Sequence, residues 1–321
     1  MTTSFDSLDF GPHLDIAARS SAGAGPGARH ENQDNFLLVD ITGTAHFLNG
    51  QDYIQQRIPG WTQGHARVAV LDGMGGHGRG REAAEAVVAG LLAMPPCTSL
   101  ESLGERLDAL HTSLQHSFAG DCPASKRPGT TLTLLELRPD QAALLYHVGD
   151  SRLYEIRNGQ TCPLTIDHVP ATAYAMDGMV DEHEWWRQVH AEHRSQISQA
   201  FILGNAFSSA AELSDPLYPL SPANLPPFLR HLPDRRALAL APGALYLLAT
   251  DGFWSCDSPN QWVAHWAEIL ECTSGANATC NRLFEEMLER PPDGLHPDNI
   301  TAVVIRPRGF EETALPGEYK C

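Results

Sequence analysis

Four aspartates stand beside apolar runs at widely separated points of this 321-residue chain: Asp34, Asp72, Asp251 and Asp298. Residues 68–71 lead directly into Asp72, and residues 245–249 end just before Asp251. This pattern predicts buried strands that deliver carboxylates where the chain leaves the core. Carboxylates gathered in this way repel one another unless a cation lies between them. Because oxygen ligands without a Cys or His cluster favour Mg²⁺ or Mn²⁺ over Zn²⁺, we expect a carboxylate-bound centre of hard divalent ions.

The composition, with 42% hydrophobic and 19% charged residues, is typical of a folded protein and predicts that the chain is soluble. No apolar stretch approaches the ~20 residues that cross a bilayer, and the first residues lack the pattern of a signal peptide, so a cytoplasmic location is expected. A net charge of −17 disfavours nucleic acid or an anionic membrane as a partner. Seven cysteines without a Cys-x-x-Cys pair fit reduced thiols.

Apolar periodicities predict a mixture of strands and helices in one domain. Strands are expected near residues 13–18, 35–40, 68–71, 130–137, 142–148, 152–156, 245–249 and 300–305. Helices are expected near residues 81–93, 100–118, 181–200, 259–270 and 278–288. Consecutive strands with short connections are most simply antiparallel. Residues 41–66 are expected to be irregular, and the proline-rich residues 216–233 to form an extended surface segment, interpreted as a covering loop rather than a partner motif.

Seven motifs in sequence order resemble the metal-dependent protein serine/threonine phosphatases, the PPM or protein phosphatase 2C family, in its bacterial form. The motifs are Arg29 to Asp34, Asp72 to His77, Gly129 to Thr131, Gly149 to Arg152, Thr165 to His168, Thr250 to Gly252 and Asp298 to Thr301. The resemblance implies an α/β (α+β) fold, a four-layer α-β-β-α sandwich with two central antiparallel sheets. It also implies tails at residues 1–11 and 309–321, a phosphatase domain at 12–308, a flap at about 169–203 and a proline-rich insert at about 214–234.

The resemblance further implies a site with two Mn²⁺ or Mg²⁺ ions that share Asp72. Asp251 and Asp298 would complete one coordination sphere, the Gly73 carbonyl would join the other, and Asp34 would bind or orient metal waters. Ions of this kind keep several waters, which neighbouring carboxylates can hold. The catalytic step implied is in-line attack by a water that bridges the metals.

Two further residues have roles that the resemblance implies. Arg29 would bind the substrate phosphate through its forked guanidinium. Asp150 would join Asp251 at a weaker third metal, although an aspartate at this position is also typical of a hairpin turn.

Two positions depart from the family pattern. Gln33 stands where many members carry Glu, which removes one negative charge from the site. Met74 stands where animal relatives carry a histidine proposed as general acid, and a thioether cannot donate a proton. A metal-bound water or His77 is then the candidate proton donor. We interpret the Asp-Gly-Met-Gly-Gly-His wording as a trait of bacterial members.

The function implied is hydrolysis of phosphoserine and phosphothreonine in proteins, in bacterial signalling opposite a Ser/Thr kinase. One alternative is a catalytically weak module of the same fold that binds a partner, and another is a metal-dependent hydrolase of small phosphate esters. A serine hydrolase is excluded because the chain has no Gly-x-Ser-x-Gly elbow. The flap histidines His183, His190 and His193 could form a metal site, but a polar helix face with a tryptophan packed inward is favoured.

Overall fold

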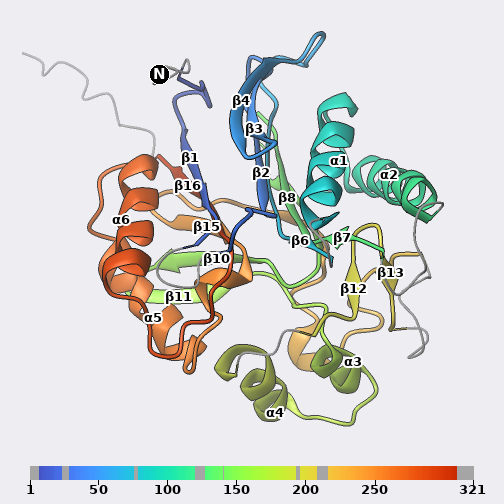
Figure 1. Ribbon diagram of the computed structural model, residues 1–321, viewed down its shortest axis with the longest axis vertical. Helices are drawn as coiled ribbons and strands as arrows, with labels where there is room; N and C mark the ends of the chain where they lie inside the picture. The colour runs from blue at the N-terminus through green and yellow to red at the C-terminus, as the bar shows by residue number, and fades with distance from the viewer. Residues whose placement is uncertain are drawn as a thin grey trace, which may run out of the picture.

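The computed structural model describes residues 7–23, 29–75, 79–119, 127–139, 141–192, 196–207 and 216–308. Two antiparallel sheets face each other at its centre (Figure 1). The seven-stranded sheet has, in spatial order, the strands β14 (Arg235–Leu238), β9 (Ala143–Val148), β8 (Leu132–Leu137), β5 (Ala66–Leu71), β2 (Asn35–Val39), β3 (Thr44–Asn49) and β4 (Asp52–Arg57). The five-stranded sheet has β1 (Leu14–Ser21), β16 (Ile300–Pro307), β15 (Leu245–Ala249), β10 (Arg152–Arg157) and β11 (Gln160–Pro163).

Strand β5 shows why the central strands have continuous apolar sequences. Val68 and Val70 point into the core between the two sheets, whereas Ala69 and Leu71 point into the core under the helices. All four side chains have no exposed surface. Because both faces of the strand are covered, neither face calls for polar residues. Burial of each large apolar side chain contributes roughly 1.5–3 kcal/mol to folding.

Helices cover the outer face of each sheet. Helices α1 (Arg79–Ala93) and α2 (Leu100–Ala119) pack on the seven-stranded sheet, and α5 (Pro259–Leu270) and α6 (Ala276–Glu289) pack on the five-stranded sheet. In Figure 1 the two helix pairs lie on opposite sides of the paired sheets. The predicted four-layer α-β-β-α sandwich is therefore confirmed. None of the helices in the described ranges is long and apolar enough to span a membrane.

The expectation of irregular chain at residues 41–66 is wrong, because β3 and β4 form a hairpin there. Asn49 pairs with Asp52, which leaves a two-residue loop in which Gly50 has φ 57° and Gln51 has φ 73°. Positive φ at both loop residues matches the twist of the flanking strands. Gly50 adopts positive φ readily because it has no Cβ atom.

The single strand expected at residues 130–137 is divided into β7 (Gly129–Thr130) and β8. Strand β7 pairs with the short β6 (Gly73–Met74) rather than with the main sheet. The break falls at Thr131, whose backbone N–H donates to the carbonyl of Asp72 over 2.9 Å. Val70 lies opposite Thr133 and Gly73 lies opposite Thr130, so the register is the same on both sides of the break and this bond carries the pairing past Asp72.

The single helix expected over residues 181–200 is also wrong. The chain has α3 (Pro170–Met176), α4 (Glu182–Trp186) and a π-helical turn η3 (Arg187–Ala191), after which Glu192 is extended. A short ribbon of β12 (Gln199–Ala200) and β13 (Gly204–Asn205) follows within the described residues.

The proline-rich segment beyond residue 216 covers this flap region. It contains a short 3₁₀ turn, η4 (Pro227–Leu229), and buries Leu220 and Leu225 in a cluster with Trp185 and Val189. The segment is therefore packed against the flap instead of lying free on the surface. Residues 214 and 215 of the expected insert lie outside the described residues.

Candidate metal centre

The strand pairing brings the acidic motifs to one edge of the molecule. Asp34 precedes β2 and Asp72 follows β5, and these strands pair so that Asn35 lies opposite Leu71. Asp251 follows β15 and Asp298 precedes β16, which pair in the same antiparallel manner. Since the start of one antiparallel strand lies beside the end of its partner, each sheet delivers two aspartates to a common edge.

Hydrogen bonds hold the two sheet edges together. Thr250 Oγ1 donates to Asp34 Oδ2 over 2.8 Å, and the Thr250 N–H donates to the Thr301 carbonyl over 3.1 Å. Gln33 N–H donates to Asn299 Oδ1 over 2.8 Å, and Asn299 Nδ2 donates to the Glu31 carbonyl over 3.0 Å. The acids of one sheet are thereby fixed relative to those of the other.

A cleft of about 450 Å³ lies between these edges. Four of the predicted metal-facing residues with side-chain carboxylates line it together with the Gly73 backbone: Asp72, Asp150, Asp251 and Asp298. Asp34 lies behind them, buried to 2% exposure, while the other four keep part of their surface open to the cleft. The structure thus brings together the aspartates that the sequence predicted to converge.

The carboxylates perturb one another strongly. Burial, together with repulsion from Asp251 and Asp298, raises the pKa of Asp34 to about 8, against the lowering effect of its hydroxyl donors. Burial and repulsion from Asp298 raise the pKa of Asp251 to about 6. Burial and the neighbouring aspartates also raise the pKa values of Asp72 and Asp150 well above the ordinary range. Such a donor set fits a divalent cation, which would replace the protons that the free chain retains.

The close approach of backbone at Asp72 explains its glycine neighbour. A Cβ atom at Gly73 would overlap the carbonyl oxygens of Gln33 and Gly80. The Gln33 side-chain oxygen also lies against Gly80, so this residue faces the start of α1. Only glycine lets the three chain segments meet here.

Hydroxyl groups fix the backbone of Asp72 relative to the turn that carries Asp150. Thr131 Oγ1 accepts the Asp72 N–H over 2.8 Å and lies 2.6 Å from Ser151 Oγ. Thr131 and Ser151 belong to motifs that the sequence singled out, but sequence reasoning gave neither a role. Their position inside those motifs was the available signal.

Arg29 lies at the rim of the cleft. Its Nη2 is 3.2 Å from Asp298 Oδ1, and its Nε donates to the Pro297 carbonyl over 3.1 Å. The Arg29 side chain is 57% exposed, and an ion pair in such a position is worth about 0–1 kcal/mol. The guanidinium can therefore leave Asp298 at little cost when a stronger anion enters.

A second cavity of about 130 Å³ adjoins the cleft and shares Asp150 and Asp251 with it. At its wall, Arg152 Nη2 lies 2.7 Å from Asp167 Oδ2 and donates to the Val189 carbonyl over 2.7 Å. The same guanidinium lies over the Trp254 ring at 4.6 Å from the centroid. Arg152 thus joins the flap to the acidic edge, a role that the sequence did not reveal.

Within the described residues, no three Asp, Glu, His or Cys side chains form a group that could hold an ion by themselves. The predicted proton donor His77 lies outside the described residues, whereas Met74 lines the cleft. Which oxygens bind each ion directly stays a prediction.

The flap histidines do not converge in the described chain. His183 is exposed on α4, and His190 is buried beside Trp185, with ring centroids 5.4 Å apart. His193 lies outside the described residues. Trp185 is buried and Trp186 is 44% exposed, as expected for a polar face with one tryptophan packed inward.

Comparisons with known proteins agree with this architecture. The protein is an α-β-β-α sandwich with acids collected at one edge of its facing sheets. The chain belongs to the protein phosphatase 2C family, because the family model described as Protein phosphatase 2C matches residues 42–289. This confirms the resemblance drawn from the motifs.

Individual relatives are distant. The serine/threonine protein phosphatase PstP of Mycobacterium tuberculosis is 26% identical over 240 residues, which are 74% of this chain and 39% of that protein. The chain therefore spans less than half the length of that relative. The S. agalactiae serine/threonine phosphatase has a TM-score of 0.62 at 22% identity, over 92% of this chain and 100% of the other. The PstP catalytic domain in complex with two manganese ions has a TM-score of 0.57 at 22% identity, over 92% and 99% of the two chains.

Proposed function

We propose that the protein hydrolyses phosphoserine and phosphothreonine in other proteins, with Mn²⁺ or Mg²⁺ as cofactor. The observation that carries the proposal is the convergence of Asp72, Asp150, Asp251 and Asp298 on one cleft, with Asp34 behind them. Membership of the protein phosphatase 2C family and the two manganese ions of the PstP structure support the same reading.

The metal would be held by this chain's oxygen atoms. Asp72 lies in the same cleft as the acids of the other sheet. It would face two ions, with Asp251 and Asp298 on one side and the Gly73 carbonyl on the other. Asp34 would orient metal waters, and Asp150 would face a weaker third ion. Bound there, such ions supply an activated water as nucleophile and neutralise charge on the phosphoryl group.

The protein's own contribution is to place the phosphate and to keep the carboxylates rigid. Arg29 at the rim would exchange Asp298 for two phosphoryl oxygens, which suits its forked geometry. Thr250 and Thr131 hold the acidic motifs through hydroxyl bonds. No covalent bond between enzyme and phosphate is required, so no Cys or Asp nucleophile enters the reaction.

The two alternatives are less well supported. A catalytically weak partner module would not need the full set of converging acids, and Gln33 and Met74 alone do not disturb that set. A hydrolase of small phosphate esters would also suit the acids. Membership of the protein phosphatase 2C family and the protein phosphatases among the relatives favour the protein substrate.

The proposal also covers the domain boundaries, the partners and the location of the protein. We place the phosphatase domain at residues 12–308 with a flap at about 169–203, and expect a phosphoprotein substrate, an opposing Ser/Thr kinase and a cytoplasmic location. Neither nucleic acid nor a membrane is expected as a partner. Support comes from the acidic net charge and from the bacterial Ser/Thr phosphatases among the relatives.

The test is a metal screen on the purified full chain. Phosphate release from a phosphothreonine peptide should require Mn²⁺ or Mg²⁺, cease with EDTA and exceed p-nitrophenyl phosphate hydrolysis in kcat/KM. Preference for the small ester would favour the second alternative. Absence of turnover on every substrate with either metal would overturn the proposal.

A further inference from the structure

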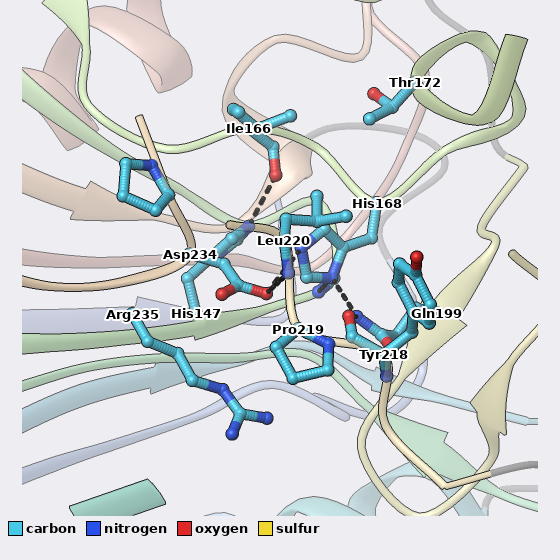
Figure 2. A network of polar contacts seen from close by, with 12 residues as sticks. His147, Ile166, His168, Thr172, Gln199, Tyr218, Pro219, Leu220, Asp234 and Arg235 are labelled. Carbon is cyan, nitrogen blue, oxygen red and sulfur yellow. Dashed lines mark hydrogen bonds and ion pairs between the residues drawn. The ribbon is translucent and has the colours of Figure 1, made fainter. Parts of the chain in front are cut away.

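A buried polar network lies behind the turn that carries Asp150 (Figure 2). At its centre, His168 Nε2 is 3.6 Å from Asp234 Oδ2, and the two side chains are 0% and 1% exposed. Neither residue lines the cleft, and the proposed chemistry uses neither of them. Buried polar groups need compensating partners, so their contacts indicate what the pair holds in place.

The contacts of His168 fix its tautomer. Gly149 N–H donates to His168 Nδ1 over 3.2 Å, and Gln199 Nε2 lies 2.9 Å from the same nitrogen. The amide of Gln199 is oriented by Tyr218, because Gln199 Oε1 accepts the Tyr218 N–H and Gln199 Nε2 donates to the Tyr218 carbonyl. Two donors therefore meet at His168 Nδ1, which must lack a proton.

The single proton of a neutral His168 ring is then on Nε2, which faces Asp234 (Figure 2). Burial lowers the pKa of His168 well below its usual range, which agrees with a neutral ring. The 3.6 Å contact with Asp234 is longer than a hydrogen bond, and Nε2 has no hydrogen-bond partner among the described residues. The two donors at Nδ1 therefore fix the ring, and the nearby Asp234 favours this orientation by electrostatic attraction of the Nε2–H.

His168 forms two hydrogen bonds with Gly149, the residue before Asp150. In addition to the bond at its ring, the His168 N–H donates to the Gly149 carbonyl over 2.8 Å. Gly149 has φ +111°, and a Cβ atom there would lie 2.6 Å from Thr131 Cγ2. The direction in which Asp150 enters the cleft is thus set by a glycine whose two backbone groups both bind His168.

Asp234 connects the contacts between His168 and Gly149 to the proline-rich segment. Its Oδ2 accepts the Leu220 N–H over 2.9 Å, and its N–H donates to the Leu220 carbonyl over 3.1 Å. Its own carbonyl accepts the His147 N–H of β9 over 2.9 Å. One end of the segment therefore binds Gln199, a partner of His168, through Tyr218, and the other end carries Asp234, which faces His168 itself.

We propose that His168, oriented by Asp234, is a positioning residue for Asp150. We further propose that the proline-rich segment holds His168 and its partners in place. The inference rests on the proposed function in so far as Asp150 faces a metal ion. The proline-rich segment would then have a role at the site, because it would help to hold the Asp150 carboxylate in place although its own residues do not line the cleft.

A double-mutant cycle tests the proposal. Asp234→Asn keeps the size of the side chain but removes the carboxylate opposite His168 Nε2. Residues that orient a metal ligand typically change metal affinity by about 10- to 100-fold, so the weakest Mn²⁺ binding step, followed by electron paramagnetic resonance of free Mn²⁺, should weaken about tenfold. Asp150→Asn should weaken that step while leaving it measurable at high Mn²⁺, and the double variant should match Asp150→Asn alone, because Asp234 acts through Asp150.

Two variants of His168 separate positioning from filling of space. Asn can present an oxygen near the place of Nδ1 and still accept from Gly149, whereas Leu fills the buried volume without any acceptor. The proposal predicts tighter Mn²⁺ binding for His168→Asn than for His168→Leu, the reverse of the order expected if only packing mattered. These variants also serve if Asp234→Asn fails to fold.

Tyr246→Phe is the matched control. It removes the hydrogen bond that the buried Tyr246 of β15 donates to Glu155 over 2.7 Å, outside the contacts of His168 and Asp234. It should lower stability and leave the Mn²⁺ isotherm unchanged.

Several outcomes would overturn the inference: an unchanged isotherm in Asp234→Asn, additive effects in the cycle, or better binding by His168→Leu than by His168→Asn. Mn²⁺ binding by the wild-type chain without phosphatase activity would instead count against the proposed function, while the cycle would still report on positioning.

Discussion

Thr250 donates its hydroxyl proton to Asp34 Oδ2 over 2.8 Å, although the two residues are 216 positions apart in the chain. The same oxygen of Thr250 accepts the Thr301 N–H over 3.0 Å. One hydroxyl thus joins the edges of both sheets at the point where their acids meet. Since Asp34 is buried, it depends on such donors for compensation.

Thr250→Val should therefore lower both the free energy of unfolding and the phosphatase activity. The valine has the same shape but leaves Asp34 and the Thr301 N–H without this partner. A buried polar group left unpaired costs about 1–3 kcal/mol, which thermal unfolding would detect. Thr250→Ser keeps the hydroxyl and should retain most of the activity; equal loss in both variants would show that the methyl group, not the hydroxyl, matters.

Asp72→Asn should abolish turnover without unfolding the protein. The change removes a charge that both ions would share, and loss of activity by about 100-fold or more is expected for a central metal-facing group. In EDTA the variant should be as stable as the wild type or more so, because burial and like charges already raise the pKa of Asp72. Phosphopeptide turnover and thermal unfolding in EDTA test both halves. A variant with full activity would remove Asp72 from the site.

Arg29→Ala should impair substrate binding more than folding. The Arg29 side chain is largely exposed and pairs only with the rim, so the stability change should stay within about 0.5 kcal/mol. Loss of a forked phosphate contact should lower kcat/KM by about 10- to 100-fold. Arg29→Lys keeps the charge without the fork and should fall between alanine and wild type. A kcat/KM in Arg29→Ala equal to that of the wild type would contradict the role.

The stability of the metal-free protein should decrease as pH rises from about 7 to 9. Asp34, with a pKa of about 8 in the folded chain, holds a proton there that the unfolded chain lost near its ordinary pKa of about 4. The folded state therefore binds more protons, so the free energy of unfolding falls with pH up to about 8 and levels off above that, once the folded chain has also lost the proton. The buried histidines have lowered pKa values and are neutral in both states over this range.

Thermal unfolding in EDTA across this pH range measures the effect. Mn²⁺ should abolish the decrease, because the ion takes the place of the protons. In Asp34→Asn the decrease should be smaller. A melting temperature that rises with pH in EDTA would contradict the assignment of raised pKa values.

Much of the fold follows from local patterns in the sequence. The helix at Pro259–Leu270 has the predicted boundaries, and the apolar runs before Asp72 and Asp251 are the central strands β5 and β15. The hairpin at Gly50 was missed because its strands carry many polar residues and because its loop residues, Gly50 and Gln51, are not an Asn-Gly pair. The helix over residues 181–200 was overextended because periodicity does not report where tertiary contacts end a helix.

Part of the site could likewise be predicted from the sequence and part could not. The aspartates could be predicted because each stands at the end of an apolar run. The groups that hold them could not, because Thr131 and His168 bind backbone N–H groups of residues distant in sequence, and Ser151 binds the Thr131 hydroxyl. Pairing of that kind depends on the register of the sheets, which a single sequence does not specify.

The central claim is that these aspartates hold a pair of divalent ions. Anomalous diffraction from crystals grown with Mn²⁺ tests it most directly. The account predicts two strong peaks inside the cleft, both within coordination distance of the Asp72 carboxylate. A cleft without anomalous density at saturating Mn²⁺, or peaks that avoid Asp72, would contradict it.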